Sequence, residues 1–236
     1  MKMICGLQKM TLLDFPGKIA CTVFLGGCNF RCPFCHNSEL FMGKPEKLME
    51  DDEFFQFLST RKGLLDGVCV SGGEPTLYKD LPDFLGKIKE MGFLVKLDTN
   101  GYRPEVLKTL VERKLVDYVA MDVKNSAAMY ARTVGLERMN MDAIEESLRF
   151  LIGGSVAYEL RTTLVKPFHD EATIQDMGVW LGSLVPGKRP QKLFLQSFVD
   201  RDTVLFSGLT APETEATQEF AKILAPFAEQ VTIRNP

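Results

Sequence analysis

Three cysteines of this 236-residue chain, Cys28, Cys32 and Cys35, lie within one short stretch at the spacing C-x3-C-x2-C. A thiolate is a soft ligand, and three that are so close in sequence can converge on one small inorganic group. Iron–sulfur clusters are usually held by four cysteines, so three would leave one iron of a four-iron cluster open. The spacing therefore favours a cluster whose open iron can hold a reactant.

Zinc is the alternative metal for these thiolates, with His36 as the fourth ligand of a tetrahedral site. That arrangement is disfavoured because structural zinc sites usually combine two ligand pairs far apart in sequence, whereas His36 directly follows Cys35. A disulfide framework is disfavoured too, because the chain is long, shows no secretory leader and has six cysteines. A protein that holds zinc or a cluster without catalysis remains an alternative function.

The composition is that of an ordinary globular protein, with 45% apolar and 25% charged residues. A net charge of −3 argues against a general nucleic-acid or membrane-surface binder. No apolar run is long enough for a transmembrane helix. Free thiols without an export signal predict a cytoplasmic protein, and an open iron–sulfur site would suit an anaerobic setting.

Stretches typical of β-strands alternate with stretches at helical spacing along the chain. Strands are expected at residues 18–25, 67–71, 94–98, 117–122, 156–165 and 192–197, with a short last strand at 230–234. Helices are expected at residues 47–58, 81–91, 141–151, 172–184 and 212–226, and another is expected to begin at Pro104. Residues 1–16 are expected to be irregular.

This alternation predicts an α/β fold with a parallel sheet and crossover helices. Six βα units are fewer than an eightfold barrel needs, so we expect a partial (β/α)6 TIM-like barrel. A doubly wound open sheet is the alternative. The whole chain, 1–236, is expected to be a single domain, with a lead-in at 1–17, a barrel core at 18–200, and a C-terminal helix and strand at 201–236.

Each expected strand ends in polar residues. In parallel βα proteins the ligand lies at the carboxyl ends of the strands, so these side chains are expected to share one pocket. The residues concerned, strand by strand, are Ser71 to Glu74, Asp98 and Thr99, Asp122 and Lys124, Arg161 with Thr162 and Thr163, and Gln196 with Ser197.

The cysteine loop, with aromatic Phe34 before its last cysteine, resembles the cluster motif of the radical S-adenosylmethionine (SAM) enzymes. Gly72-Gly73-Glu74-Pro75 resembles their GGEP motif, and the continuation Cys35-His36-Asn37 resembles the activating enzymes of glycyl radical proteins. The resemblance implies the radical SAM type of partial barrel. It also implies a [4Fe-4S] cluster on Cys28, Cys32 and Cys35, with Gly72, Gly73 and Glu74 at the amino group of SAM.

Two further segments, Asp98-Thr99-Asn100-Gly101 and Asp122-Val123-Lys124, resemble the DTNG and D-x-K segments of those activases. The resemblance implies that Asp98, Thr99, Asp122 and the carbonyl of Ala120 hold a monovalent cation beside the SAM carboxylate. Hard oxygen ligands suit such an ion. The remaining expected SAM-binding residues are Lys124, Arg161 and Gln196.

The implied activity is reductive cleavage of SAM, followed by removal of one hydrogen atom from a glycine of a partner enzyme. The implied electron donor is a flavodoxin or ferredoxin, and the implied partner is an anaerobic ribonucleoside-triphosphate reductase. One alternative is an activase of pyruvate formate-lyase, although Phe198 stands where those activases have a histidine. Another is a small-molecule radical SAM enzyme such as a deazaguanine synthase. Neither nucleic acid nor membrane is an expected partner.

Overall fold

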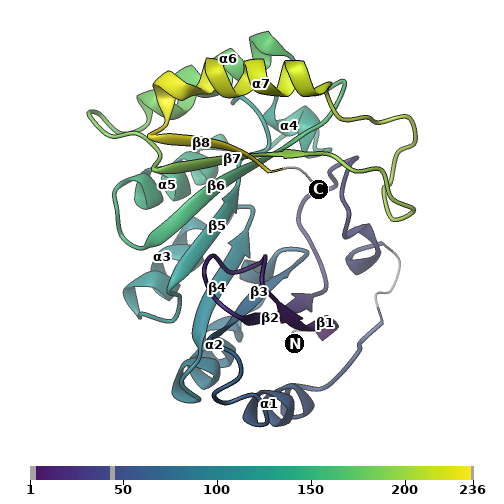
Figure 1. Ribbon diagram of the computed structural model, residues 1–236, viewed down its shortest axis with the longest axis vertical. Helices are drawn as coiled ribbons and strands as arrows, with labels where there is room; N and C mark the ends of the chain where they lie inside the picture. Colours follow the sequence, from purple (N-terminus) through teal and green to yellow (C-terminus); the bar gives the residue numbers. More distant parts are fainter. Residues whose placement is uncertain (1–3, 43–45, 235–236) are drawn as a thin grey trace. The chain divides into compact units, whose positions relative to one another are not determined.

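The computed structural model describes residues 4–42 and 46–234. Its strands form an eight-stranded sheet in the order β1 to β8 (Figure 1). By their internal contacts, the described residues divide into two compact units. The first unit holds residues up to 29, 37–99 and 105–120, and the second holds 30–36, 100–104 and the residues from 121 on.

The first unit contains the first strands of the sheet. β1 pairs antiparallel with β2, while β2–β3 and β3–β4 are parallel pairs. Its strands are β1 (Ile4–Thr11), β2 (Ala20–Leu25), β3 (Gly67–Gly72), β4 (Leu94–Thr99) and the first three residues of β5 (Tyr118–Asp122). Its helices are η1 (Ser38–Leu40), α1 (Asp51–Ser59), η2 (Pro75–Leu77), α2 (Leu81–Glu90) and most of α3 (Pro104–Glu112).

Helix α2 shows how sequence pattern becomes packing in this unit. Its buried residues Leu81, Phe84, Leu85 and Ile88 recur at helical spacing and form one apolar face. The ring of Phe84 stacks on Phe54 of α1 with centroids 5.4 Å apart. These contacts hold the helices against the strands whose ends carry the polar residues.

The second unit contains β6 (Ala157–Leu164), β7 (Lys192–Ser197) and β8 (Gln230–Arg234), all paired in parallel. Its helices are α4 (Tyr130–Thr133), α5 (Met141–Ile152), α6 (Glu171–Ser183), α7 (Thr214–Leu224) and η3 (Ala225–Phe227). Helix α6 begins with a capping box, in which Asp170 accepts from the backbone of Thr173 at 2.8 Å.

The expected strands and long helices are confirmed, and so is the α/β class with a mostly parallel sheet. The expectation that residues 1–16 are irregular was wrong, because residues 4–11 form β1. Within the described part of the chain, the helices are too short or too polar to cross a membrane.

Candidate active site

In the first unit, the Gly-Gly-Glu turn after β3 lies against the chain that leads into the cysteine loop. The backbone N–H of Glu74 donates to the carbonyl of Gly27 at 2.8 Å. A Cβ atom on Gly73 would lie 1.9 Å from that same oxygen and 3.3 Å from the Cβ of Cys28. Only a glycine permits this approach, so the structure brings the GGEP turn and the first cysteine together.

Asn37 adds a second link between the cysteine motif and this turn. Its side-chain amide donates to the carbonyl of Gly72 at 3.0 Å. Gly72 has φ of +120°, a conformation that L side chains rarely adopt, and a Cβ there would lie 2.3 Å from the oxygen of Leu25. The end of β3 is therefore fixed by backbone contacts that any side chain at these glycines would break.

Glu74 is fully buried and organises its own motif. Its Oε1 accepts from the backbone N–H of Thr76 at 3.0 Å and from the hydroxyl of Thr99 at 2.8 Å. The hydroxyl of Thr76 donates to the same oxygen. This carboxylate therefore ties the GGEP turn to the end of β4, where Thr99 was expected to bind a ligand.

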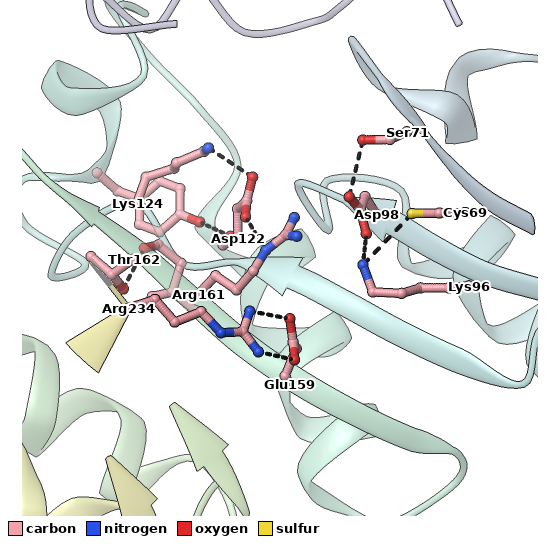
Figure 2. Close-up of polar contacts among 12 residues, drawn as sticks. Cys69, Ser71, Lys96, Asp98, Asp122, Lys124, Glu159, Arg161, Thr162 and Arg234 are labelled. Carbon is pink, nitrogen blue, oxygen red and sulfur yellow. Dashed lines mark hydrogen bonds and ion pairs between the residues drawn. The ribbon is translucent and has the colours of Figure 1, made fainter. Parts of the chain in front are cut away.

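Asp98 lies at the end of β4 with protein partners on both of its carboxylate oxygens (Figure 2). Lys96 forms an ion pair with Oδ1, and the hydroxyl of Ser71 donates to Oδ2 at 3.0 Å. The Lys96 ammonium also lies 3.7 Å from the sulfur of Cys69. Only 1% of Lys96 is exposed, so this cation is buried beside Asp98.

In the second unit, the cysteine loop turns tightly and is fixed by aromatic residues. The backbone N–H of Cys35 donates to the carbonyl of Cys32 at 3.1 Å. The buried ring of Phe34 packs on Phe168, with centroids 5.8 Å apart. His36 makes a hydrogen bond within a loop region: its Nε2 lies 2.7 Å from the carbonyl oxygen of Val199.

Asp122, at the end of β5, gathers two cations in the second unit (Figure 2). The Lys124 ammonium lies 2.9 Å from its Oδ2, and Nε of Arg161 donates to its Oδ1 at 3.0 Å. Three of the expected SAM-binding residues of this unit, Asp122, Lys124 and Arg161, are therefore joined in one network. It places two positive charges at a single carboxylate.

Lys124 also interacts electrostatically with two cysteines of the loop. Burial by itself lowers the pKa of Lys124, but attraction to Asp122 and to the Cys32 and Cys35 thiolates outweighs it and raises the pKa above its usual value. The ammonium group is therefore firmly charged and lies near two of the three cysteines. A cation in that position suits an anionic group bound next to the metal.

His169 holds the backbone of Lys124 through a hydrogen bond, a role that the sequence did not indicate. The backbone N–H of Val165 donates to its Nδ1 at 3.1 Å, so Nε2 carries the proton and donates to the Lys124 carbonyl at 2.9 Å. Burial lowers the pKa of His169. A His-Asp pair in a loop gives no sequence signal for such a contact.

Gln196, expected to bind SAM, lies on β7 in register with Thr163 of β6 and Arg234 of β8. Arg234 extends across the sheet to the buried carboxylate of Glu159, with nitrogen–oxygen distances of 3.0 and 2.9 Å (Figure 2). Its guanidinium carbon lies 3.4 Å from the ring centroid of Phe194. Gln196 thus belongs to the face of the sheet that carries Arg161.

The donor set suits an iron–sulfur cluster. The motif supplies three cysteine sulfurs, whereas among the described residues no three His, Cys, Asp or Glu side chains gather closely enough to hold a single metal ion. The loop supplies soft sulfur ligands and buried aromatic cover, as a cluster requires.

The expected monovalent cation is not supported. Asp98 already contacts Lys96 and Ser71, Asp122 already contacts Lys124 and Arg161, and the Thr99 hydroxyl donates to Glu74. An added ion would have to share both aspartates with cations of the chain that already pair with them.

The sequence profile of the Radical SAM superfamily matches residues 22–153, which is more than half of the 236 residues. The chain belongs to the radical SAM superfamily. Membership implies a [4Fe-4S] cluster and SAM. The matched range contains the cysteine loop, the GGEP turn and Asp122 with Lys124, while Arg161 and Gln196 lie outside it.

A protein of Methanocaldococcus jannaschii named "Putative glycyl-radical enzyme activating enzyme" is 34% identical over 99% of this chain and 96% of its own length. This overlap places the chain in the glycyl-radical enzyme activating type of the superfamily. The pyruvate formate-lyase-activating enzyme of Clostridium pasteurianum is also 34% identical, over 52% of each chain.

Among solved structures, QueE from Escherichia coli aligns with 99% of this chain and 92% of its own, with a TM-score of 0.58 and 14% identity. At that identity the likeness concerns the fold alone, and it confirms the radical SAM type of partial barrel.

Proposed function

We propose that this protein cleaves SAM reductively and uses the resulting radical to remove one hydrogen atom from a glycine of a partner enzyme. When bound, the cluster would supply the electron that splits SAM into methionine and a 5′-deoxyadenosyl radical. The protein's own residues bind SAM, orient it and exclude water. No side chain is required to act as a general base.

The observation that carries the proposal is the position of Lys124. Its ammonium joins Asp122 and lies near Cys32 and Cys35, while Arg161 approaches the same aspartate. Two cations at one carboxylate, next to thiolates that hold metal, suit the carboxylate of SAM. In the first unit, Cys28 would be a cluster ligand, and Gly72, Gly73, Glu74, Asp98 and Thr99 would bind SAM. In the second unit, Gln196 would be a further SAM contact.

For the partner we favour an anaerobic ribonucleoside-triphosphate reductase, with a flavodoxin or ferredoxin as the electron donor. One support is the segment Leu13 to Gly17, which resembles the corresponding segment of such activases. Another is that the sequence after the cysteine motif is too short to contain the inserted cluster domain of some other activases. A pyruvate formate-lyase is the second candidate, supported by the 34% identity to the Clostridium pasteurianum activase. Phe198 disfavours this second candidate, because the activases of pyruvate formate-lyase have a histidine at that position.

The partner is tested by incubating the reconstituted, reduced protein and SAM with each purified candidate enzyme under anaerobic conditions. Electron paramagnetic resonance then shows whether a glycyl radical forms. The proposal expects the signal on the ribonucleotide reductase, and a reductase whose radical glycine is replaced by alanine is the control. A signal on pyruvate formate-lyase alone would move the assignment to the second candidate.

A further inference from the structure

Lys96 is a buried cation in the middle of β4 that the sequence motifs do not include. Lys96 and Asp98 are two residues apart on one strand, so their side chains lie on the same face of the sheet. On the neighbouring strand β3, Cys69 is in register with Lys96, and Ser71 follows two residues later on that face. These four side chains form one compact polar group within the first unit (Figure 2).

The contacts within this group fix the Asp98 carboxylate at both oxygens. Lys96 pairs with Oδ1, and Ser71 donates to Oδ2 at 3.0 Å. The side chain of Lys96 is 2% exposed and that of Asp98 is 16% exposed. An ammonium removed from water needs a nearby anion, and the same pairing keeps the carboxylate ionised and in one orientation.

We propose that Lys96 is a positioning residue that supplies the counter-charge of Asp98 from within the chain, so that SAM binding needs no external monovalent cation. The proposal rests on the proposed function, since it takes Asp98 as part of the SAM site. A tethered ammonium offsets the same negative charge that a bound ion would offset. It does so at Oδ1 of Asp98, while Oδ2 accepts from the hydroxyl of Ser71 and the hydroxyl of Thr99 donates to Glu74.

The test compares the unaltered chain with Lys96→Met, which keeps most of the length of the side chain and removes its charge. Lys89→Met is the matched control, because Lys89 also pairs with an aspartate of the first unit, Asp117, at 2.6 Å. Asp117 contacts the backbone of Val95 near the start of β4, whereas Asp98 lies near the end of that strand. Each protein is studied in sodium, potassium and choline chloride at equal ionic strength, so that screening is constant.

Two readouts are used. The first is the thermal unfolding midpoint of the protein without cluster, which does not depend on SAM chemistry. The second is the dissociation constant of SAM for the cluster-loaded protein. We expect the unaltered chain and Lys89→Met to give the same values in all three salts. In choline, Lys96→Met should bind SAM about tenfold more weakly or worse, and sodium or potassium should restore part of the affinity and raise the midpoint.

The proposal is overturned if the unaltered chain needs sodium or potassium as much as Lys96→Met does, or if the variant shows no salt-specific change. Absence of SAM binding by every protein would instead refute the proposed function, while the unfolding midpoints would still decide the role of Lys96. If Lys96→Met does not fold, Lys96→Arg should retain cation independence. The double variant Lys96→Met/Asp98→Asn should then recover folding, because it leaves no unpaired buried charge; failure of both would also overturn the proposal.

Discussion

Gly73 is the residue at which one added methyl group should do the most harm. The new Cβ of Gly73→Ala would lie 1.9 Å from the Gly27 carbonyl oxygen, so the GGEP turn must move away from the cysteine loop. We expect a loss of about 3 kcal/mol in the free energy of unfolding. Reconstitution should also yield less bound iron, measured per chain.

Gly86→Ala is the matched control for that substitution. Gly86 lies within α2, and the nearest neighbour of an added Cβ is a Leu115 methyl group at 4.0 Å. Alanine is the better helix former, so this variant should gain up to about 1 kcal/mol in stability and keep its iron. Equal behaviour of the two variants would refute the close-approach explanation for Gly73.

Lys124 is the side chain on which SAM affinity should depend most. Lys124→Met removes a cation that lies between Asp122 and the thiolates of Cys32 and Cys35. We expect SAM to bind about tenfold more weakly or worse, as measured by equilibrium binding to the cluster-loaded protein. Lys222→Met, which removes an exposed α7 pair with Glu219, is the control. Unchanged affinity in Lys124→Met would contradict the assignment.

His169 should make stability depend on pH. Burial lowers the pKa of His169 in the folded state below the value in the unfolded chain, so the folded state binds its proton less readily. The stability that neutral His169 contributes is fully present above the pKa of the unfolded state, near 6.5. It is lost as the pH falls from there through the lower pKa of the folded state. Denaturant titrations between neutral and mildly acidic pH should show a smaller loss of stability in His169→Gln than in the unaltered chain.

At the residue scale, spacing predicted the chemistry but not the supporting contacts. The Cys28–Cys35 stretch and the GGEP turn are local motifs, and local sequence is enough to recognise them. Lys96 and His169 could not be assigned in this way, because Lys96 contacts Cys69 of β3 and His169 contacts the backbone of Lys124, 45 residues earlier. The expected cation is not supported, because Asp98 already pairs with Lys96 on its own strand and accepts from Ser71 of β3.

At the scale of elements, β8 depends on a charge pair that reaches across the sheet. Arg234 of β8 binds the buried Glu159 of β6 through two nitrogen–oxygen contacts and covers the ring of Phe194. Arg234→Met leaves Glu159 buried without this partner, so we expect a loss of about 3 kcal/mol, the lower end for a buried pair, because the arginine is 33% exposed. Thermal or denaturant unfolding measures it.

Arg149→Met provides the comparison for β8. Arg149 pairs with Glu145 along α5 and is 51% exposed, so its removal should cost no more than about 0.5 kcal/mol. A loss in Arg234→Met as small as this would mean that the strand pairing with β7 alone holds β8.

Sequence patterns predicted the buried strands well and missed β1. The strands β3, β4, β5 and β7 are short, mostly apolar runs that end at polar residues or glycine, which is the pattern of a parallel sheet. β1 is antiparallel, three of its eight residues are exposed, and its pairing with β2 shifts register between Ile4 and Gly6 and between Gln8 and Thr11. An irregular edge strand has no clean alternation, so the sequence carries little signal for it.

At the scale of the whole molecule, the expected site residues fall into two groups. The first unit holds Cys28, the GGEP turn, Asp98 and Thr99, and the second holds Cys32, Cys35, Asp122, Lys124 and Arg161. The α/β architecture followed from the alternation of strands and helices, which needs no knowledge of side-chain contacts. The partner enzyme did not, because a protein interface is built from loops whose pattern carries no general code.

The most direct test of the central claim is the formation of 5′-deoxyadenosine by the reconstituted protein. The protein is loaded anaerobically with iron and sulfide, reduced with dithionite and given SAM, with and without the candidate ribonucleotide reductase. The account predicts product that disappears in Cys32→Ala. A protein that carries a reducible cluster yet forms no 5′-deoxyadenosine, even with the partner present, would contradict it.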